Sequence, residues 1–127
     1  MGFRFGSSRD KGLAGETLAV RYLKKNGYAI QERNYRCPLG EIDIIARTRT
    51  HLVFVEVKTR LTPSYGTPEA AVDFQKQRTL SKVALFYLKT HDLLDVRARF
   101  DVVAIDGSGD TRPDIHLIEN AFEIAYG

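Results

Sequence analysis

The sequence lacks most of what several common classes of protein need. Among its 127 residues there is one cysteine, Cys37, and no tryptophan. A single cysteine excludes an internal disulfide and a cysteine-based zinc site. The three histidines, His51, His91 and His116, do not follow the spacing of metal ligands. No nucleophile–histidine–acid pattern and no phosphate-binding glycine loop occurs, and no apolar run approaches the roughly 20 residues that span a bilayer. We therefore expect no membrane anchor.

The composition that remains is typical of a soluble globular domain. Hydrophobic residues make up 43% of the chain and charged residues 28%. Residues 1–11, rich in Gly, Ser and Arg, predict a flexible N-terminal arm, followed by a single domain over residues 12–127. The N-terminus lacks the apolar core of a secretion signal, so a cytoplasmic location is expected. Lys and Arg number 19 against 16 Asp and Glu, and this net charge of +3 permits a nucleic-acid partner without requiring one.

Hydrophobic periodicity predicts the order helix, strand, strand, strand, helix, strand, strand. Helical spacing of apolar residues extends over 13–26 and 67–89, and Thr67 followed by Pro68 is typical of a helix start. Strands are predicted over 28–35, 40–46, 52–58, 99–105 and 115–118. The short polar segment between the second and third strands predicts an antiparallel hairpin. This order predicts an α/β fold with a mixed sheet flanked by helices.

The predicted hairpin carries charged residues in otherwise apolar strands. Alternation places Asp43 on one face of the first strand and both Ile42 and Ile44 on the other. On the next strand, Glu56 and Lys58 share a face. Charges among such residues are unfavourable to bury unless each has a partner. The hairpin therefore predicts either a cluster of mutually satisfied charges or a metal site.

The residue types on this hairpin suit metal-dependent phosphodiester chemistry. Carboxylates on adjoining strands, Asp43 and Glu56, can hold Mg²⁺ or Mn²⁺, with the backbone carbonyl of Val57 as a third ligand. A bound metal lowers the pKa of its water, and Lys58 can orient that water or stabilise developing negative charge. The same residues would equally suit a structural ion-pair cluster without catalysis. The spacing alone leaves both interpretations open.

Further charged residues are candidates for the same site. Glu16 lies on the apolar stripe of the first predicted helix, either as a boundary carboxylate that bends out to solvent or as an acid aimed at the site of Asp43. Asp101 is predicted to be structural, paired with Arg99 or with a helix residue. Several cations are close to the acids in sequence and suit phosphate contacts: Arg36, Arg47, Arg49, Arg60, Lys76 and Arg78. Of these we choose Arg36, Arg60 and Lys76 as the candidates for nucleic-acid binding.

Motifs along most of the chain resemble known families. Gly40-Glu41-Ile42-Asp43, followed by Val53-Phe54-Val55-Glu56-Val57-Lys58-Thr59-Arg60, resembles the PD-(D/E)xK motif of restriction-endonuclease-like nucleases. Ile42 stands where that motif has its proline. From about Gly12 to Ile105 the chain also resembles the YraN-like family of uncharacterised bacterial proteins, by these motifs: Gly15-Glu16, Tyr22-Leu23, Gly27-Tyr28, Asn34-Tyr35-Arg36, Ala71-Val72 with Lys76, and Arg99-Phe100-Asp101-Val102-Val103.

The resemblance implies a function as well as a fold. The YraN-like family is similar in core to archaeal Holliday-junction resolvases, which are dimeric and use Mg²⁺. This implies a restriction-endonuclease-like fold and an Mg²⁺- or Mn²⁺-dependent endonuclease acting on DNA, with branched DNA among its substrates and a homodimer as its assembly. By the same resemblance Glu16 is the helix-borne acid, Asp43 and Glu56 are metal ligands, and Lys58 is the catalytic lysine. The alternative is a nucleic-acid-binding or interaction module of the same fold without turnover.

Overall fold

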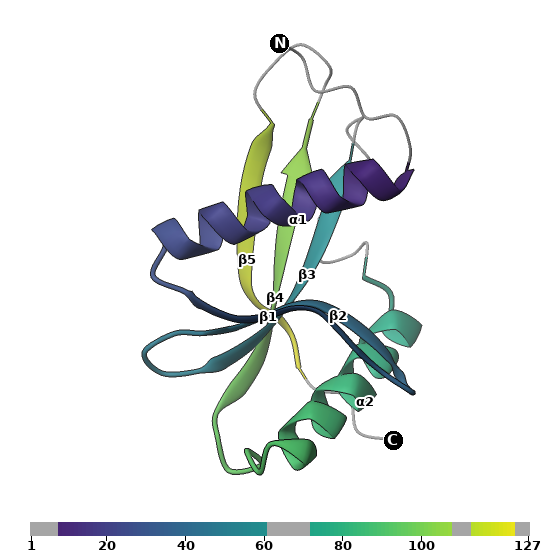
Figure 1. Ribbon diagram of the computed structural model, residues 1–127, viewed down its shortest axis with the longest axis vertical. Helices are drawn as coiled ribbons and strands as arrows, with labels where there is room; N and C mark the ends of the chain where they lie inside the picture. Colours follow the sequence, from purple (N-terminus) through teal and green to yellow (C-terminus); the bar gives the residue numbers. More distant parts are fainter. Residues whose placement is uncertain (1–7, 61–71, 108–112, 124–127) are drawn as a thin grey trace.

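Two helices and one five-stranded sheet make up the described part of the computed structural model, which covers residues 8–60, 72–107 and 113–123 (Figure 1). The elements are α1 (Ser8–Lys25), β1 (Ala29–Cys37), β2 (Gly40–Arg47), β3 (Leu52–Arg60), α2 (Phe74–Thr90), β4 (Ala98–Asp106) and β5 (Asp114–Phe122). This order is the predicted one, and the predicted α/β fold is confirmed. In the described ranges, neither helix has the length and apolar character needed to cross a membrane.

The strands lie in the sheet in the order in which they occur in the chain. Neighbouring strands are antiparallel except β3 and β4, which are parallel and are connected through α2. Parallel neighbours need such a crossover because a tight turn cannot join them. The sheet is therefore mixed, as predicted, with β3 and β4 on either side of its parallel junction.

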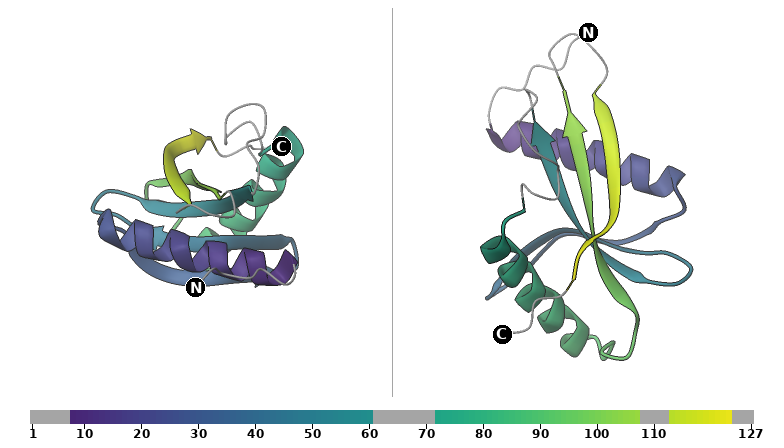
Figure 2. Two further views of the ribbon diagram at one scale, coloured as in Figure 1. Left: turned by 90° about the horizontal axis from the view of Figure 1, so that it is seen from above. Right: turned by 180° about the vertical axis from the view of Figure 1, so that it is seen from behind.

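Each face of the sheet is covered by one helix (Figure 2). Alternation along β3 sends Val53 and Val55 to one face and Leu52 and Phe54 to the other. The first face forms the α1-side core, with Ala19, Val20, Leu23, Tyr28, Ile44, Ala46, Val103 and Ile105. The second forms the α2-side core, with Ile42, Ile45, Val72, Leu80, Val83, Ala84, Tyr87, Leu88, Phe100 and Val102. The buried stripes predicted for both helices are present in these cores.

Helix boundaries differ from the predicted ones. Helix α1 begins at Ser8 rather than at Leu13, so residues 8–11 of the predicted arm are helical, while residues 1–7 lie outside the described part. The prediction that the second helix continues from Thr67 was wrong: Asp73 precedes Phe74 as N-cap, and its carboxylate accepts from the Lys76 N–H at 2.8 Å. An Asp cap satisfies an orphan N–H and suits the positive end of the helix dipole. Thr67 itself is outside the described residues.

The β1–β2 hairpin diverges from the rest of the sheet (Figure 1). The register between β2 and β3 extends from Arg47–Leu52 to Ile44–Val55 and ends there, although both strands continue. Residues 40–43 and 56–60 therefore lie beyond the paired segment. The divergence opens the sheet at the position where the sequence places its strand acids.

A twist in the hairpin accompanies this divergence. Ile42 packs in the α2-side core and Ile44 in the α1-side core, so the prediction that they share a face was wrong. On the neighbouring strand Asn34 has a φ of 53°, and it lies between the register pairs that Arg33 and Tyr35 make with these two isoleucines. A left-handed residue within a strand reorients the backbone, and Asn tolerates that conformation better than most residues.

Candidate active site

Asp43 and Glu56 lie just beyond the last register pair of β2 and β3. The N–H of Val57 donates to Asp43 Oδ2 at 2.8 Å, in place of the partner that a continued ladder would provide. In a strand, the N–H and C=O of one residue point toward the same neighbour. The Val57 carbonyl therefore borders the same strand separation, next to the Asp43 carboxylate.

The two carboxyl groups strongly affect each other's protonation. Burial raises the pKa of Glu56 to about 7, helped by the charge of Asp43 and by a hydrogen bond between the two groups. Burial also raises the pKa of Asp43, against the opposing effect of the Val57 N–H. In such a bond one carboxyl group must carry a proton. Paired buried acids of this kind are stabilised by a cation and are typical of functional sites.

Two lysines from different elements face this pair. The ammonium of Lys58, on β3, lowers the pKa of Glu56. Lys76, in the first turn of α2, lowers the pKa of both Glu56 and Asp43. The Asp73 cap fixes the backbone of that first turn. The crossover helix thus brings a positive charge to the acids of the sheet.

Glu16 approaches from α1, on the other face. Its side chain is buried, and its pKa is raised by burial first and then by the charge of Asp43, while Arg33 lowers it. The Asn34 amide is assigned with its nitrogen toward Glu16, the orientation that satisfies its hydrogen bonds, and it then donates to both carboxylate oxygens of Glu16, at 2.9 Å to Oε1 and 3.1 Å to Oε2. Of the two interpretations of Glu16, the geometry favours the acid near Asp43 over the carboxylate that bends out to solvent.

Each candidate arginine forms an ion pair with a carboxylate on the adjacent strand. Arg36 Nε lies 3.1 Å from Glu41 Oε2 near the end of the β1–β2 hairpin, where both side chains are exposed. Arg60 Nε and Nη2 donate to the two carboxylate oxygens of Asp106, at 2.7 and 3.0 Å. The second pair is partly buried and joins the ends of β3 and β4. Each of these arginines is therefore paired with an acid of an adjacent strand.

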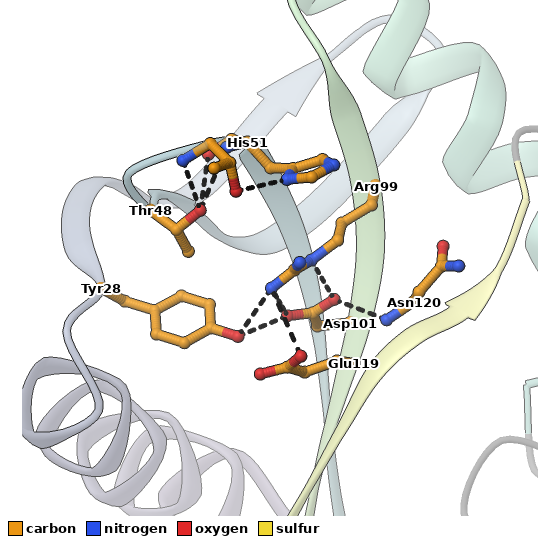
Figure 3. Close-up of polar contacts among 8 residues, drawn as sticks. Tyr28, Thr48, His51, Arg99, Asp101, Glu119 and Asn120 are labelled. Atoms are coloured by element: carbon orange, nitrogen blue, oxygen red, sulfur yellow. Dashed lines mark hydrogen bonds and ion pairs between the residues drawn. The ribbon is translucent and has the colours of Figure 1, made fainter.

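Closeness in sequence was misleading for two other arginines. Arg47 pairs in register with Leu52, and Arg49 lies in the turn between them. This turn is closed by Thr48 Oγ1, which accepts from the His51 N–H at 3.0 Å (Figure 3). Both arginines therefore lie at the opposite end of the β2–β3 hairpin from its strand acids.

The donor set can be compared with the needs of a divalent ion. Within residues 8–60, 72–107 and 113–123, no three His, Cys, Asp or Glu side chains are grouped so as to hold a metal. The chain offers two convergent carboxylates, Asp43 and Glu56, with the Val57 carbonyl beside them. Mg²⁺ is commonly bound by one or two carboxylates and retains several waters. The residues present therefore fit an ion of this kind that is only partly coordinated by protein.

A second buried carboxylate, Asp101, has a different role (Figure 3). It accepts hydrogen bonds from the Tyr28 hydroxyl at 2.7 Å, from Arg99 Nε at 3.1 Å and from the Asn120 N–H at 2.9 Å. The predicted pairing with Arg99 is confirmed. With its oxygens satisfied by fixed donors on three elements, Asp101 ties β4 to β5 and to the start of β1.

Sequence reasoning did not single out Asn34 as a site residue. An asparagine within a predicted strand is a signal of irregular backbone, because Asn is depleted in strands and enriched at positive φ. That signal does not identify which side chain the amide will meet. The contact with Glu16 depends on how α1 packs across the sheet.

Comparisons with known proteins place the chain among similar sequences. Residues 15–105 match the uncharacterised protein family UPF0102. A UPF0102 protein of Syntrophus aciditrophicus is 49% identical over 128 residues, which cover 98% of each chain. One of Geobacter sulfurreducens is 52% identical, over 95% of this chain and 96% of its own. One of Lachnoclostridium phytofermentans is 48% identical, over 92% and 95%.

Proposed function

The chain belongs to the UPF0102 family, the YraN-like proteins of the restriction-endonuclease-like superfamily, and we propose that it is a metal-dependent endonuclease that hydrolyses phosphodiester bonds in DNA. One observation carries the proposal. Two carboxyl groups, the half-buried Asp43 and the buried Glu56, converge where β2 and β3 separate. The charge of Asp43 acts on Glu16 of α1, and Lys76 of α2 lowers the pKa of both carboxyl groups.

The proposed roles follow from the chemistry of the groups. Asp43, Glu56 and the Val57 carbonyl would hold Mg²⁺ or Mn²⁺. Bound there, the ion would lower the pKa of a coordinated water and offset charge on the phosphate. In hydrolysis the water oxygen bonds to phosphorus while the bond from phosphorus to the leaving sugar oxygen breaks. The Lys58 ammonium would orient the water or stabilise the negative charge that develops on the phosphoryl oxygens.

Two further residues complete the proposed site. Glu16 would be the helix-borne acid, adding negative charge beside Asp43. Lys76 would contact the substrate phosphate from the start of α2, since its charge already acts on the carboxylate pair. Arg36 and Arg60 belong to the proposal as outer phosphate contacts, of which Arg60 is the more restrained because its Nε and Nη2 both donate to Asp106.

The substrate class and the assembly rest on resemblance. Similarity to archaeal Holliday-junction resolvases makes branched DNA the first substrate to test and a homodimer the expected assembly. The protein's own residues support a phosphodiester site and do not distinguish one DNA structure from another. The substrate panel therefore spans single-stranded, duplex, flap and four-way-junction DNA.

The test uses purified protein with each labelled DNA in EDTA, Mg²⁺ or Mn²⁺. Lys58→Met removes the ammonium while keeping an unbranched side chain, and Lys82→Met changes an exposed lysine on α2 as the matched control. We expect metal-dependent cutting that falls by about 10²- to 10⁴-fold in Lys58→Met, the usual range for one positioned catalytic group, and that persists in Lys82→Met. Failure to cut any substrate with either metal would overturn the proposal.

A second function is favoured by one feature of the site. Since no three His, Cys, Asp or Glu side chains of the described residues are grouped so as to hold a metal, a binding module without turnover is the alternative. Its signature is DNA binding without cutting on every substrate. A purely structural ion-pair core predicts instead that Glu56→Ala or Lys58→Met unfolds the protein. Circular dichroism and thermal melting of the variants separate a folded inactive protein from an unfolded one.

A further inference from the structure

We propose that Asn34 is a positioning residue, whose side-chain amide holds the Glu16 carboxylate of α1 at the strand acid Asp43. The inference deepens the proposed nuclease function and rests on it for its catalytic consequence. It concerns a contact between a strand and a helix, made to the site acid Glu16 by a residue that the proposed site does not include. Its basis is the backbone of β1, the two hydrogen bonds, and the charges around Glu16.

The backbone conformation of Asn34 sets the direction of its side chain. Asn34 has a φ of 53° within β1, and it faces Asp43 across the β1–β2 register, between the pairs Arg33–Ile44 and Tyr35–Ile42. A left-handed residue inside a strand is unfavourable for most side chains and persists only where the surroundings impose it. At this position it accompanies the divergence of the hairpin and directs the amide toward α1.

The contact is made with both oxygens of one carboxylate. With the Asn34 amide assigned in the orientation that satisfies its hydrogen bonds, its nitrogen lies 2.9 and 3.1 Å from Glu16 Oε1 and Oε2, while Asn34 itself is exposed and Glu16 is buried. A hydrogen bond to a charged acceptor is stronger than one between neutral groups. An exposed residue that bonds a buried acid restrains that acid from the solvent side.

The surrounding charges make such a restraint necessary. Asp43 and Glu41 repel the Glu16 carboxylate, and Arg33 attracts it. The Arg33 guanidinium, however, is exposed and donates through Nη2 to Thr17 Oγ1 at 3.4 Å. A neutral amide can hold Glu16 beside Asp43 without adding a positive charge that would compete with a divalent ion. A hydrogen-bond partner that does not itself bind the metal commonly orients a carboxylate in this way.

The experiment distinguishes the effect of the Asn34 side-chain amide from the effect of its backbone conformation. Asn34→Gly keeps a residue that accepts positive φ and removes the side chain, whereas Asn34→Asp keeps the shape and replaces the donor by a carboxylate. Asn120, with a φ of 51° on β5, offers the matched control Asn120→Gly. Each protein is measured for Mn²⁺ affinity by calorimetry, for kcat and KM on the DNA that the wild type cuts, and for its melting temperature.

We expect Asn34→Gly to bind Mn²⁺ about tenfold more weakly and to lose about tenfold or more in kcat, as partners of ligating groups do. KM for DNA and the melting temperature should stay near wild type, and Asn34→Asp should be impaired at least as much. Asn120→Gly should match the wild type in Mn²⁺ affinity and kcat. A fall in melting temperature alone, with unchanged kcat and Mn²⁺ affinity, would overturn the positioning role.

Two readouts keep this inference distinct from the nuclease proposal. If the wild type cuts no DNA but Asn34→Gly still weakens Mn²⁺ binding, the nuclease proposal fails and the positioning role stands. A crystal structure of Asn34→Gly provides the second readout, independent of metal and substrate. A Glu16 carboxylate displaced from Asp43 supports the inference, and one in its original place overturns it.

Discussion

The buried acids of this protein differ in how their charge is satisfied. Asp101 receives fixed donors from a tyrosine, an arginine and a backbone N–H, so its carboxylate oxygens are satisfied without any ligand. Asp43 and Glu56 have the Val57 N–H and each other. Asp101 and the pair of Asp43 and Glu56 are all shielded from solvent, but only the pair can still bind a proton or a cation. This difference in partners separates the structural carboxylate from the candidate active site.

The raised pKa of Glu56 predicts how stability depends on pH. Its ordinary pKa is 4.5, and burial raises it to about 7 in the folded protein. Between these values the folded state binds more protons than the unfolded state, so the free energy of unfolding falls as pH rises from about 4.5 to about 7. Glu56→Gln is neutral throughout and can still donate to Asp43. We expect it to reduce this fall by at most about 3 kcal/mol.

Urea unfolding of the wild type and of Glu56→Gln at pH 5 and pH 8, without divalent metal, measures the effect. The change in unfolding free energy between the two pH values should be larger in the wild type. Glu119→Gln, an exposed acid on β5, is the control and should follow the wild type. Parallel pH profiles for wild type and Glu56→Gln would show that Glu56 titrates near its ordinary pKa.

At the scale of single residues, the sequence indicated some members of the proposed site and not others. Asp43, Glu56 and Lys58 could be proposed because charged residues are conspicuous in apolar strands. Glu16 was left between two interpretations, because helical periodicity gives the face of a residue but not the direction of its side chain. Asn34 could not be assigned, since its role depends on a left-handed backbone and on the docking of α1.

At the scale of elements, the candidate site lies where the β1–β2 hairpin diverges from β3. Helix α2 packs against the tip of that hairpin. Gly40 has a φ of +146°, and a Cβ built there would lie 3.1 Å from Val83 Cγ2 and 3.3 Å from Thr79 Cγ2. The hairpin therefore approaches the helix more closely than a residue with a side chain would allow. Periodicity predicted both elements but could not predict this approach.

Gly40→Ala should consequently be destabilising for two reasons. The backbone conformation is unfavourable for an L-residue, by about 1–3 kcal/mol, and the new methyl group crowds α2. Gly27→Ala is the matched control: its φ is +89°, and a Cβ there meets no atom within 4 Å. Chemical denaturation should show the larger loss of stability for Gly40→Ala. Equal losses would mean that backbone strain, rather than contact with the helix, accounts for the effect.

At the scale of elements, the order of helices and strands was predictable and several boundaries were not. The apolar stripes of both helices were identified because each helix is long enough for apolar residues to recur several times with the helical period of 3.6 residues. The start of α2 was misplaced because Thr67-Pro68 and Asp73 are both good helix-start signals, and tertiary packing decides between them. Strand β5 extends beyond Ile118 to Phe122, whose ring stacks on Phe100 at 4.6 Å between centroids, a contact that no local pattern reveals.

At the scale of the whole molecule, the site draws on all three layers. Glu16 comes from α1, Asp43 and Glu56 from the sheet, and Lys76 from α2. The fold class follows from element order, but the convergence of these residues follows from two helices docking on opposite faces near one opening in the sheet. Sequence could place the acids and the cations near each other along the chain. It could not distinguish Lys76, which reaches the site, from Arg47, which does not.

The distribution of charge predicts which cations contribute to DNA binding. Each phosphate contact adds about 0.9 to the slope of log affinity against log salt concentration. Lys76 acts on a site that would receive a phosphate, whereas Arg60 is held by both carboxylate oxygens of Asp106. Binding of duplex DNA in EDTA over a series of salt concentrations should show the slope of Lys76→Gln reduced by about 0.9.

Arg60→Gln is the informative comparison, because it removes the same charge from the chain. It should lower the free energy of unfolding by about 1–3 kcal/mol through loss of a charge-assisted pair, and it should reduce the salt slope by less than Lys76→Gln does, because the pairing with Asp106 restrains Arg60 as a phosphate contact. A uniform effect of net charge would instead reduce the slope equally in both variants. In that case the overall charge of +3 would account for DNA binding. The prediction that the phosphate binds at the carboxylate site would then be contradicted.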